Sequence, residues 1–519
     1  MSQSRSGTVI NNTLFLYIRS FLTMLIGIYT SRVLLVTLGI DDYGIYNLVA
    51  GIVAMFASLK GVFASSVQRF LNYAKGKKDE EQVSMIFNLS MLIHIGLAAL
   101  FGIVVEIIGV WFVLEKLNIP SESIDVALFV FHCAVLTTVI TIASIPFDAV
   151  VIANERFKYY AWITLIDSVL KLVIVYLLVA MPYQYLCSYA LLLLIIGMFN
   201  LSVNIFYCRR FRECKIHFVW DKALFKKLAS FSAWNFLGNT AFSLVNEGLN
   251  MILNIFGGVA VNAGRGIAYQ VKNAVQTLCG NIFVAVQPVI IQQAASKEKE
   301  IIFSNIFRLS RLNFYISAIT VIPIFVFAEY ILNLWLGQIP PMSVWFVKLL
   351  MMYIVIRSLH SPIDLLFKAY GRIKKYQLVD SVTLVLSLPI SYILLRIGVP
   401  LYCVFVIMSI VEIVNLSSIV VCAKYELGLN TVSYFKNVGI PCVFGFIILF
   451  SFAYLFSSFV YVDSLIAFIM YLMLVLLISI SVSVLLLGRE DRMLVVTFIK
   501  NKIKNENIIL YSWYNRWRR

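Results

Sequence analysis

Apolar stretches of about 20 residues recur along almost the whole chain, and they limit its fold more than any other feature of the sequence. A helix needs about 20 apolar residues to cross the roughly 30 Å of hydrocarbon in a membrane. Unpaired backbone groups are too costly in lipid for open strands, so these stretches predict membrane-spanning helices. The candidate spans are 12–37, 43–66, 85–114, 122–152, 162–181, 187–208, 228–255, 264–291, 308–332, 343–369, 378–396, 400–422, 438–458 and 464–487. The sequence therefore predicts an all-α polytopic membrane protein with about fourteen transmembrane helices.

The composition agrees with a chain surrounded by lipid. Of its 519 residues 61% are hydrophobic and 13% are charged, whereas soluble domains have about 45–50% and 25%. The net charge of +16 does not indicate a nucleic-acid partner, because membrane proteins place excess Lys and Arg in their cytoplasmic connections. The connections that carry this charge include 69–78, 156–158, 209–227, 297–299, 372–375 and the tail from 488. Their distribution predicts an even number of spans, with both termini in the cytoplasm.

Two segments of the sequence match each other at a constant offset of 216 residues. The matching residues are Pro146, Asp148, Ala153, Arg156, Lys158 and Tyr160 in the first segment, and Pro362, Asp364, Ala369, Arg372, Lys374 and Tyr376 in the second. Upstream, Lys77, Glu80 and Ser84 match Lys297, Glu300 and Ser304 at an offset of 220. Parallel repeats of this kind occur in transporters, where the substrate path lies between the two halves.

The repeat predicts the domain organisation. We expect two parallel six-helix bundles around a central cavity, followed by two further helices. The expected parts are an N-terminal bundle at 1–208, a basic cytoplasmic linker at 209–227, a C-terminal bundle at 228–422, two additional helices within 438–487 and a basic cytoplasmic tail at 488–519.

Three motifs point to a known group of transporters. They are Ser31-Arg32-Val-Leu with Leu38-Gly39-Ile-Asp-Asp-Tyr43-Gly44-Ile-Tyr46, then Ala153-Asn-Glu155-Arg156-Phe157, and Asn262-Ala-Gly-Arg265-Gly-Ile-Ala268-Tyr-Gln270-Val. They resemble the polysaccharide transporters of the multidrug/oligosaccharidyl-lipid/polysaccharide (MOP) exporter superfamily. The resemblance implies a flippase in the bacterial inner membrane. Such a protein moves an undecaprenyl-diphosphate-linked oligosaccharide from the cytoplasmic to the periplasmic leaflet by alternating access, for O-antigen, capsule or exopolysaccharide synthesis.

Charged residues inside the predicted spans are the candidate binding residues, because a charge that faces lipid costs several kcal/mol. The cations expected to line a path for the anionic diphosphate are Arg19, Arg32, Lys60, Arg265 and Lys272. Glu247 is a candidate for ion coupling or for a polar position in the cavity. The resemblance implies partners as well, namely the lipid-linked oligosaccharide, membrane lipids, and a polysaccharide polymerase or glycosyltransferases.

Other ionisable residues carry weaker predictions. Arg357 and Asp364 lie two turns apart on one predicted helix and are expected to pair. The four histidines and the eight cysteines are scattered, so we assign no metal site and no proton relay to them. We expect no cofactor other than a coupled H⁺ or Na⁺.

Two alternative functions remain open. A cation-coupled multidrug or metabolite exporter of the same fold should place carboxylates in the N-terminal bundle, but residues 1–40 contain no Asp or Glu. A membrane-bound polymerase or glycosyltransferase needs a long outer loop or an extramembrane domain to hold sugars. Connections on the predicted outer side, such as 182–186 and 333–342, are short. Both features favour the flippase.

The topology is testable by labelling single cysteines with a membrane-impermeant reagent. We expect residues 75–80, 212–226 and 297–299 to react from the cytoplasmic side, and 182–186 and 335–341 to react from the opposite side, because the basic connections stay in the cytoplasm. A terminus that is labelled from the outer side would contradict the even number of spans.

Overall fold

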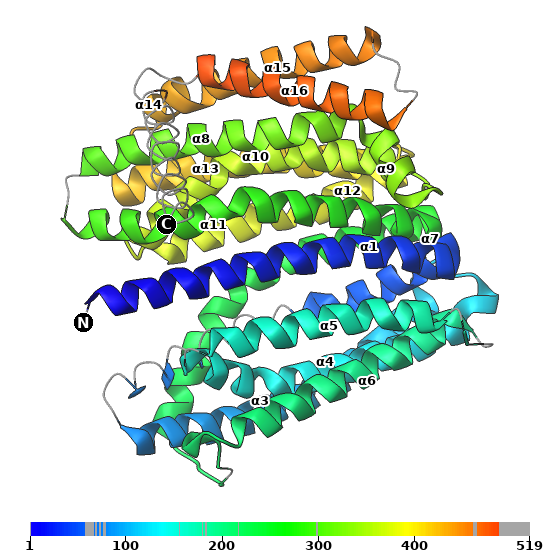
Figure 1. Cartoon of the computed structure of the whole chain (residues 1–519), viewed down its shortest axis with the longest axis vertical. Coiled ribbons are helices and arrows are strands. Elements are labelled where there is room, and N and C mark those ends of the chain that lie inside the picture. The colour runs from blue at the N-terminus through cyan, green and yellow to red at the C-terminus, as the bar shows by residue number, and fades with distance from the viewer. Residues whose placement is uncertain are drawn as a thin grey trace, which may run out of the picture. The chain divides into compact units, whose positions relative to one another are not determined.

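The computed structural model is built from helices. It describes residues 2–57, 67, 70–71, 74–75, 79–154, 156–178, 180–181, 184–215, 217–296, 299–459, 464–486 and 492. The principal helices are α1 (Ser2–Ala57), α3 (Glu80–Glu115), α4 (Ile124–Ala153), α5 (Phe157–Leu178), α6 (Tyr185–Cys208), α7 (Lys222–Ser296), α8 (Lys299–Val326), α9 (Ala328–Leu336), α10 (Ser343–Ala369), α11 (Ile373–Val385), α12 (Ser387–Arg396), α13 (Cys403–Leu427), α14 (Thr431–Tyr434), α15 (Ile440–Phe459) and α16 (Leu465–Leu486). Figure 1 labels them along the chain.

Twelve helical segments of the described chain are long and apolar enough to cross a membrane. Two of them, Phe21–Gly51 and Ala241–Cys279, each contain a single glycine at which the helix breaks. Divided at these glycines, the described segments correspond to fourteen helices. The all-α, multi-pass membrane architecture expected from the sequence is therefore confirmed.

The two breaks have the same backbone conformation. Gly39 in α1 has φ 80° and ψ 174°, and Gly258 in α7 has φ 73° and ψ −176°. Only glycine adopts this region readily, because a Cβ atom would clash with the neighbouring backbone. The sequence predicts loops between these spans, and the structure replaces each loop with one glycine. The two glycines are 219 residues apart, an offset that agrees with the proposed duplication.

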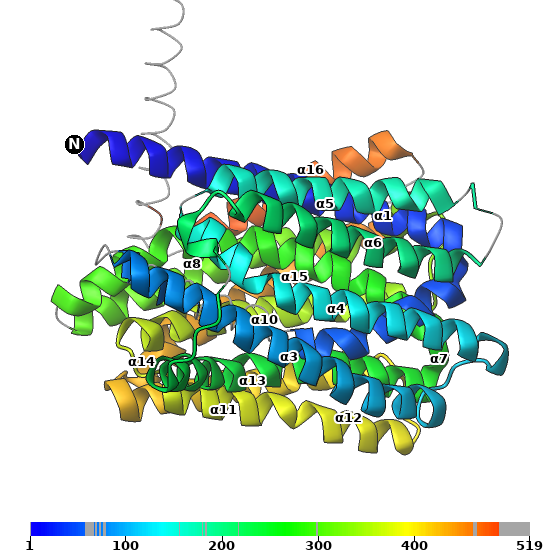
Figure 2. The same ribbon diagram turned by 90° about the horizontal axis from the view of Figure 1, so that it is seen from below.

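The first compact unit comprises residues 1–271, 332–347 and 380–411. In it α3 packs against α4, α4 against α6, and α1 against α5, and these helices lie side by side in both views (Figures 1 and 2). A core of buried side chains that includes Ile45, Leu48 and Phe131 joins α1, α3, α4 and α6. Large apolar side chains such as Ile107 and Trp111 on α3 are exposed, as expected of a surface that faces lipid.

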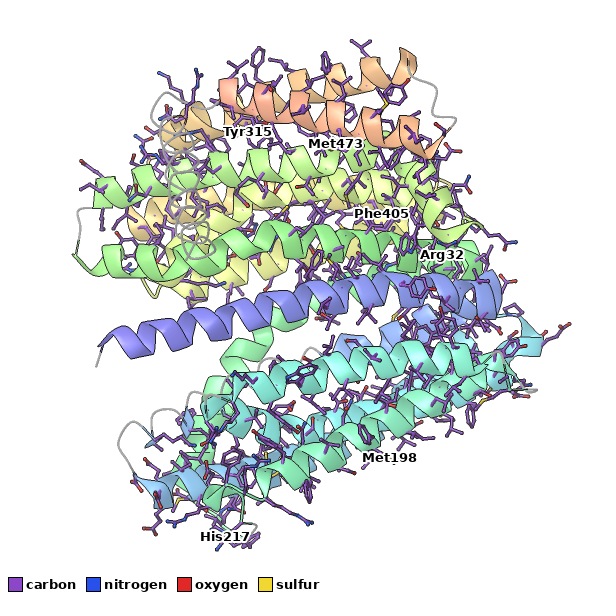
Figure 3. The ribbon with its side chains drawn as sticks, viewed as in Figure 1. Arg32, Met198, His217, Tyr315, Phe405 and Met473 are labelled. Carbon is purple, nitrogen blue, oxygen red and sulfur yellow. The ribbon has the colours of Figure 1, made fainter. Side chains whose placement is uncertain are left out.

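The second unit comprises residues 272–331, 348–379 and 412–519. Its described helices include α8, against which α15 and α16 pack (Figure 1). Gly445 of α15 allows this close packing, because a Cβ there would lie 2.6 Å from the Tyr315 hydroxyl of α8. Figure 3 labels Tyr315 in this unit. The two additional helices expected after the repeat thus pack directly against α8.

Close contact between α1 and α7 predicts a sensitive position at Gly44. A Cβ added at Gly44 would overlap the carbonyl oxygen of Val259, the residue that follows the break in α7. We expect Gly44→Ala to destabilise the protein by about 1–3 kcal/mol, because the backbones must separate. The measurement is thermal unfolding of the purified protein in detergent. Gly96→Ala in α3 is the matched control, since a Cβ there meets nothing within 4 Å. Equal melting temperatures for the two variants would contradict the close approach.

Candidate functional site

A polar cavity of about 470 Å³ lies inside the first unit, between α1, α4, α5 and α6. Much of its polar lining forms a stripe on each of three helices. The stripes are Thr137, Thr141, Ser144 and Asp148 on α4, Thr164, Asp167 and Lys171 on α5, and Asn200 and Asn204 on α6. Within each stripe the residues are three or four positions apart, a spacing that keeps side chains on one face of a helix.

Hydrogen bonds hold the two carboxylates of this cavity in place. Asn204 Nδ2 donates to Asp148 Oδ1 at 3.0 Å, and Asn204 in turn accepts from the Tyr159 hydroxyl at 2.8 Å. Asp167 accepts from Asn200 Nδ2 at 2.7 Å and forms an ion pair with Lys171, also at 2.7 Å. The lining therefore carries two carboxylates and one ammonium group, and amide and hydroxyl groups surround them.

Tyrosine rings complete the lining. Tyr46, Tyr160 and Tyr189 all line the cavity, and the rings of Tyr46 and Tyr189 meet edge to face at 5.1 Å. Hydroxyl, amide and carboxylate groups beside aromatic rings suit a ligand with many hydroxyl groups and apolar ring faces, which is the chemistry of a sugar. Among the described residues, no group of three or more His, Cys, Asp or Glu side chains lies close enough to hold a metal ion.

This cavity was not among the sites predicted from the sequence. Its polar residues are spread over three spans, and each span by itself is ordinary for a membrane helix. The signal that was present is the spacing of three and four residues, which places Thr, Ser, Asp and Asn on one face of each helix. A search for polar stripes in the apolar spans would have found it.

Two residues predicted from the sequence lie together in the first unit. Arg265 is buried, and its Nη1 lies 3.7 Å from Glu247 Oε2. Its Nη2 donates to the carbonyl oxygen of Asn246, and its guanidinium lies 3.9 Å above the ring of Tyr269. Nε of Arg265 has no hydrogen-bond partner within the described part of the chain. Arg265 therefore shares a buried site with the one acidic residue that the sequence analysis selected.

The structure describes two of the other four predicted cations. Arg32 is exposed on α1 (Figure 3). Lys272 is buried in the second unit, 5.5 Å from the ring centre of Tyr353. The side chain of Arg19 and the whole of Lys60 lie outside the described residues. The structure thus joins Arg265 to Glu247 and does not place the five cations in one described cluster.

The prediction that Arg357 pairs with Asp364 is wrong. Arg357 instead forms an ion pair with Glu412 of α13, 2.9 Å away, and Asp364 pairs with Lys368 at 2.6 Å on its own helix. A separation of seven residues is almost two turns of helix, about 10 Å along the axis, so partners one turn away or on the next helix are closer.

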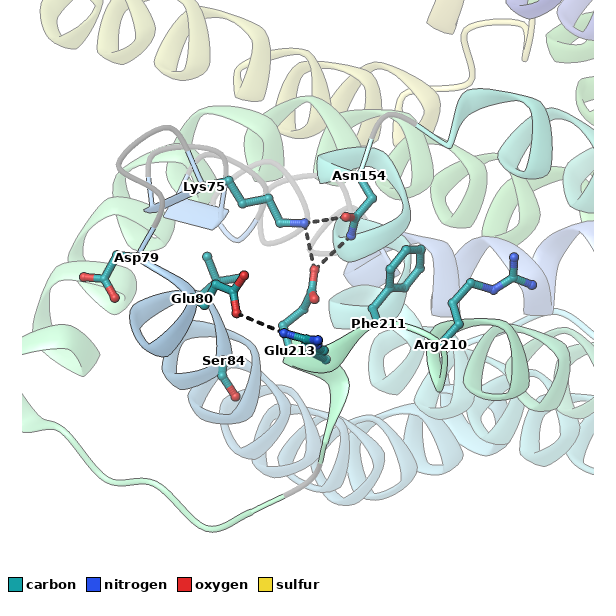
Figure 4. A pocket seen from close by; sticks show the side chains of 10 residues that line it. Lys75, Asp79, Glu80, Ser84, Asn154, Arg210, Phe211 and Glu213 are labelled. Atoms are coloured by element: carbon teal, nitrogen blue, oxygen red, sulfur yellow. Dashed lines mark hydrogen bonds and ion pairs between the residues drawn. The ribbon is translucent and has the colours of Figure 1, made fainter.

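A second cavity, of about 540 Å³, lies near the start of α3 and the end of α6 (Figure 4). There Lys75 Nζ donates to Asn154 Oδ1 at 2.6 Å and to Glu213 Oε1 at 2.7 Å, and Asn154 Nδ2 also donates to Glu213 Oε1 at 3.0 Å. Burial raises the pKa of the Glu213 carboxyl, but the hydrogen bonds from Lys75 and Asn154 outweigh burial and hold that pKa below its usual range. This network is formed at neutral pH, and its stabilisation is lost as the pH falls through the lowered pKa.

Several solved structures of known proteins match the fold of this chain. No protein-family model and no curated protein matches the sequence. An inward-facing multidrug resistance MATE family transporter of the MOP superfamily matches with a TM-score of 0.67 and 14% identity, over 82% of this chain and 99% of that chain. The lipid II flippase MurJ, in an inward closed conformation, matches with a TM-score of 0.64 and 14% identity, over 91% and 98%. An outward-facing MATE transporter matches with a TM-score of 0.57 and 14% identity, over 80% and 95%.

The chain has the fold of the MOP transporters. The expectation drawn from the sequence motifs is therefore confirmed at the level of the superfamily fold. Both MATE transporters and MurJ share this fold, so the finer assignment depends on the chemistry of the sites.

The pairing of Arg265 with Glu247 gives a test that separates structural from binding roles. We expect Arg265→Ala to destabilise the purified protein by about 3 kcal/mol, because it leaves the Glu247 carboxylate without its partner. The double variant Arg265→Gln with Glu247→Gln should unfold near the wild-type temperature, since no unpaired charge remains. Thermal unfolding in detergent is the measurement, and a double variant as unstable as Arg265→Ala would contradict the pairing.

Proposed function

We propose that the protein is a flippase that carries an undecaprenyl-diphosphate-linked oligosaccharide from the cytoplasmic to the periplasmic leaflet of the bacterial inner membrane. The observation that carries this proposal is the polar cavity among α1, α4, α5 and α6. When a sugar leaves water, its many hydroxyl groups lose their hydrogen bonds to water. Each hydrogen bond that the protein does not replace costs about 1–3 kcal/mol. The hydroxyl, amide and carboxylate groups of the cavity offer replacements within membrane-spanning helices.

The extent of the match with MurJ also supports a flippase. MurJ matches 91% of this chain, compared with 82% for the inward-facing MATE transporter. The chain contains α15 and α16 after the proposed repeat, and these helices pack against α8. MurJ is a lipid II flippase. A lipid-linked substrate for this chain agrees with that likeness.

The diphosphate of the substrate needs cations in place of its hydration shell. We propose that Arg265, Lys272, Arg32, Arg19 and Lys60 supply positive charge along the path. Arg265 already has Glu247 as an ion-pair partner, so it would bind phosphate by exchanging that partner, and its Nε offers a further donor. If this role holds, the double variant of Arg265 and Glu247 folds but does not export glycan.

A cation-coupled exporter is the second candidate, because of one specific observation. Asp148 and Asp167 give the cavity two carboxylates against the single ammonium group of Lys171. A cation-coupled exporter is expected to have carboxylates in its N-terminal bundle. However, Asn200 and Lys171 both bind Asp167, and Asn204 binds Asp148. Both carboxylates therefore already accept hydrogen bonds from the protein. Carboxylates held in this way can also accept hydrogen bonds from the hydroxyl groups of a sugar.

The test is complementation of a host strain that lacks the gene. We expect the deletion to remove surface polysaccharide and to leave undecaprenyl-linked oligosaccharide in the inner leaflet. Thr141→Val should lower export roughly 10-fold, because it removes one hydroxyl group. Asn204→Leu should lower export by roughly 10-fold or more, because it removes the amide that donates to Asp148 and accepts from Tyr159. Ser202→Ala is the matched control on α6, since the Ser202 hydroxyl is exposed and donates only to the carbonyl of Met198 among the described residues.

Susceptibility to cationic drugs separates the two candidates. A flippase leaves drug susceptibility unchanged in the deletion strain and in every variant. Normal surface polysaccharide together with a raised sensitivity to cationic drugs would contradict the flippase and favour the exporter.

A further inference from the structure

A smaller, apolar pocket adjoins the polar cavity of the first unit. Its volume is about 200 Å³, and its walls come from α1, α4 and α6. Three residues line both spaces, namely Tyr46, Thr137 and Leu193. The other residues that line the smaller pocket are Ala50, Val53, Val130, Ala134, Thr138 and Ala190. We call this pocket the side pocket.

Small side chains leave the space of the side pocket open. Ala50 of α1, Ala134 of α4 and Ala190 of α6 each contribute only a methyl group to its walls. Protein interiors seldom leave a void that is larger than a water molecule. The side pocket is larger than the roughly 150 Å³ that holds a benzene molecule in an engineered protein. An apolar space of this size beside a polar cavity suits a ligand with a polar part and an apolar part.

The proposed duplication indicates that the side pocket is not a general consequence of the fold. At the offset of 216 residues, three residues of the side pocket correspond to larger ones: Val130, Ala134 and Thr137 correspond to Phe346, Leu350 and Tyr353. Each of the three larger side chains is 0% exposed. At matching positions, the second repeat therefore has large buried side chains, whereas the first has small side chains around a pocket.

Thr137 lies at the boundary between the polar cavity and the side pocket. Its hydroxyl donates to the carbonyl oxygen of Cys133 at 2.8 Å, so the hydroxyl hydrogen is already used. The oxygen has two lone pairs, and it can still accept a hydrogen bond from a ligand. An amide N–H supplies the hydrogen for that bond, whereas an ester has none to donate. The boundary therefore favours an apolar group that is attached through an amide.

We propose that the side pocket binds the acyl group of an N-acylamino sugar whose ring lies in the polar cavity. The hydroxyl groups of the sugar bind to the polar groups of the cavity, and the amide N–H donates to Thr137. The hydrocarbon part of the acyl group packs among Ala50, Ala134 and Ala190. This inference rests on the proposed flippase function, because it describes one sugar of the lipid-linked oligosaccharide.

The test is a set of binding measurements on the full-length protein in lipid nanodiscs. The probes are undecaprenyl-diphosphate-linked glucose, N-acetylglucosamine and N-butanoylglucosamine, together with glucose that carries a 2-O-butanoyl ester. We expect the wild-type protein to bind the N-butanoyl probe about 10-fold more tightly than the N-acetyl probe, because two further CH₂ groups are buried. The N-acetyl probe should in turn bind more tightly than the glucose probe.

Variants of the side pocket test where the acyl group lies. Ala134→Leu introduces the residue that the second repeat has at the matching position, and it should abolish the tighter binding of the N-butanoyl probe. Ala190→Leu fills the same space from α6 and should have the same effect. Ala99→Leu on α3 is the matched control, since Ala99 is exposed and the variant should keep the tighter binding. Thr137→Val should remove the preference for the N-butanoyl probe over the O-butanoyl probe.

Equal Kd values of the wild-type protein for the N-acetyl and N-butanoyl probes overturn the inference, whatever the variants do. It is also overturned if Ala134→Leu weakens the binding of all four probes by the same factor, a result that would place the isoprenoid chain in the side pocket. If no probe binds although the deletion strain lacks surface polysaccharide, the side pocket inference fails and the flippase stands. Normal surface polysaccharide in the deletion strain would instead refute the flippase itself.

Discussion

Hydrocarbon does not solvate charge, and this constraint accounts for the placement of the ionisable residues in both units. A charge that leaves water must find a partner or be lost, because the cost of an unpaired ion is several kcal/mol. Arg265 has Glu247 and the carbonyl of Asn246, and Glu412 has Arg357 and His360.

The two proposed repeats share several local features of the backbone. Gly39 and Gly258 break their helices in the same way, and α4 and α10 each carry an internal proline, Pro146 and Pro362. A residue just after each of those helices contacts a glutamate: Asn154 donates to Glu213, and Arg372 pairs with Glu426 at 3.6 Å. The first proposed repeat has a cavity lined by hydroxyl, amide and carboxylate groups. In the second, Arg357 and His360 contact the buried carboxylate of Glu412.

Much of the fold was predictable from the sequence because lipid leaves few choices. Apolar stretches of sufficient length predict helices, and the superfamily fold followed from short motifs at Gly39, Gly44 and Arg265. The sites were harder to predict, because they depend on which helix faces which. Arg357 was assigned to Asp364 on its own helix, whereas its partner Glu412 lies 55 residues away on α13. His360 received no role because histidines distant in sequence give no sign of a shared site. The spacing of the polar residues from Thr137 to Asp148 is present in the sequence. The sequence does not show that α5 and α6 form the other walls of a cavity beside them. The boundaries of the two six-helix bundles and the cationic path stay predictions.

The central claim is that this protein moves a lipid-linked oligosaccharide between leaflets, and reconstitution measures that movement directly. Purified protein is placed in liposomes that contain the host's undecaprenyl-diphosphate-linked oligosaccharide, and a membrane-impermeant lectin reports how much sugar is exposed outside. Without protein, the lectin reaches only the oligosaccharide of the outer leaflet. With wild-type protein and a proton gradient, the account predicts that the inner-leaflet fraction becomes accessible as well, and that Asn204→Leu slows this roughly 10-fold. An accessible fraction that is the same with and without the protein, under gradients of either direction, would contradict the account.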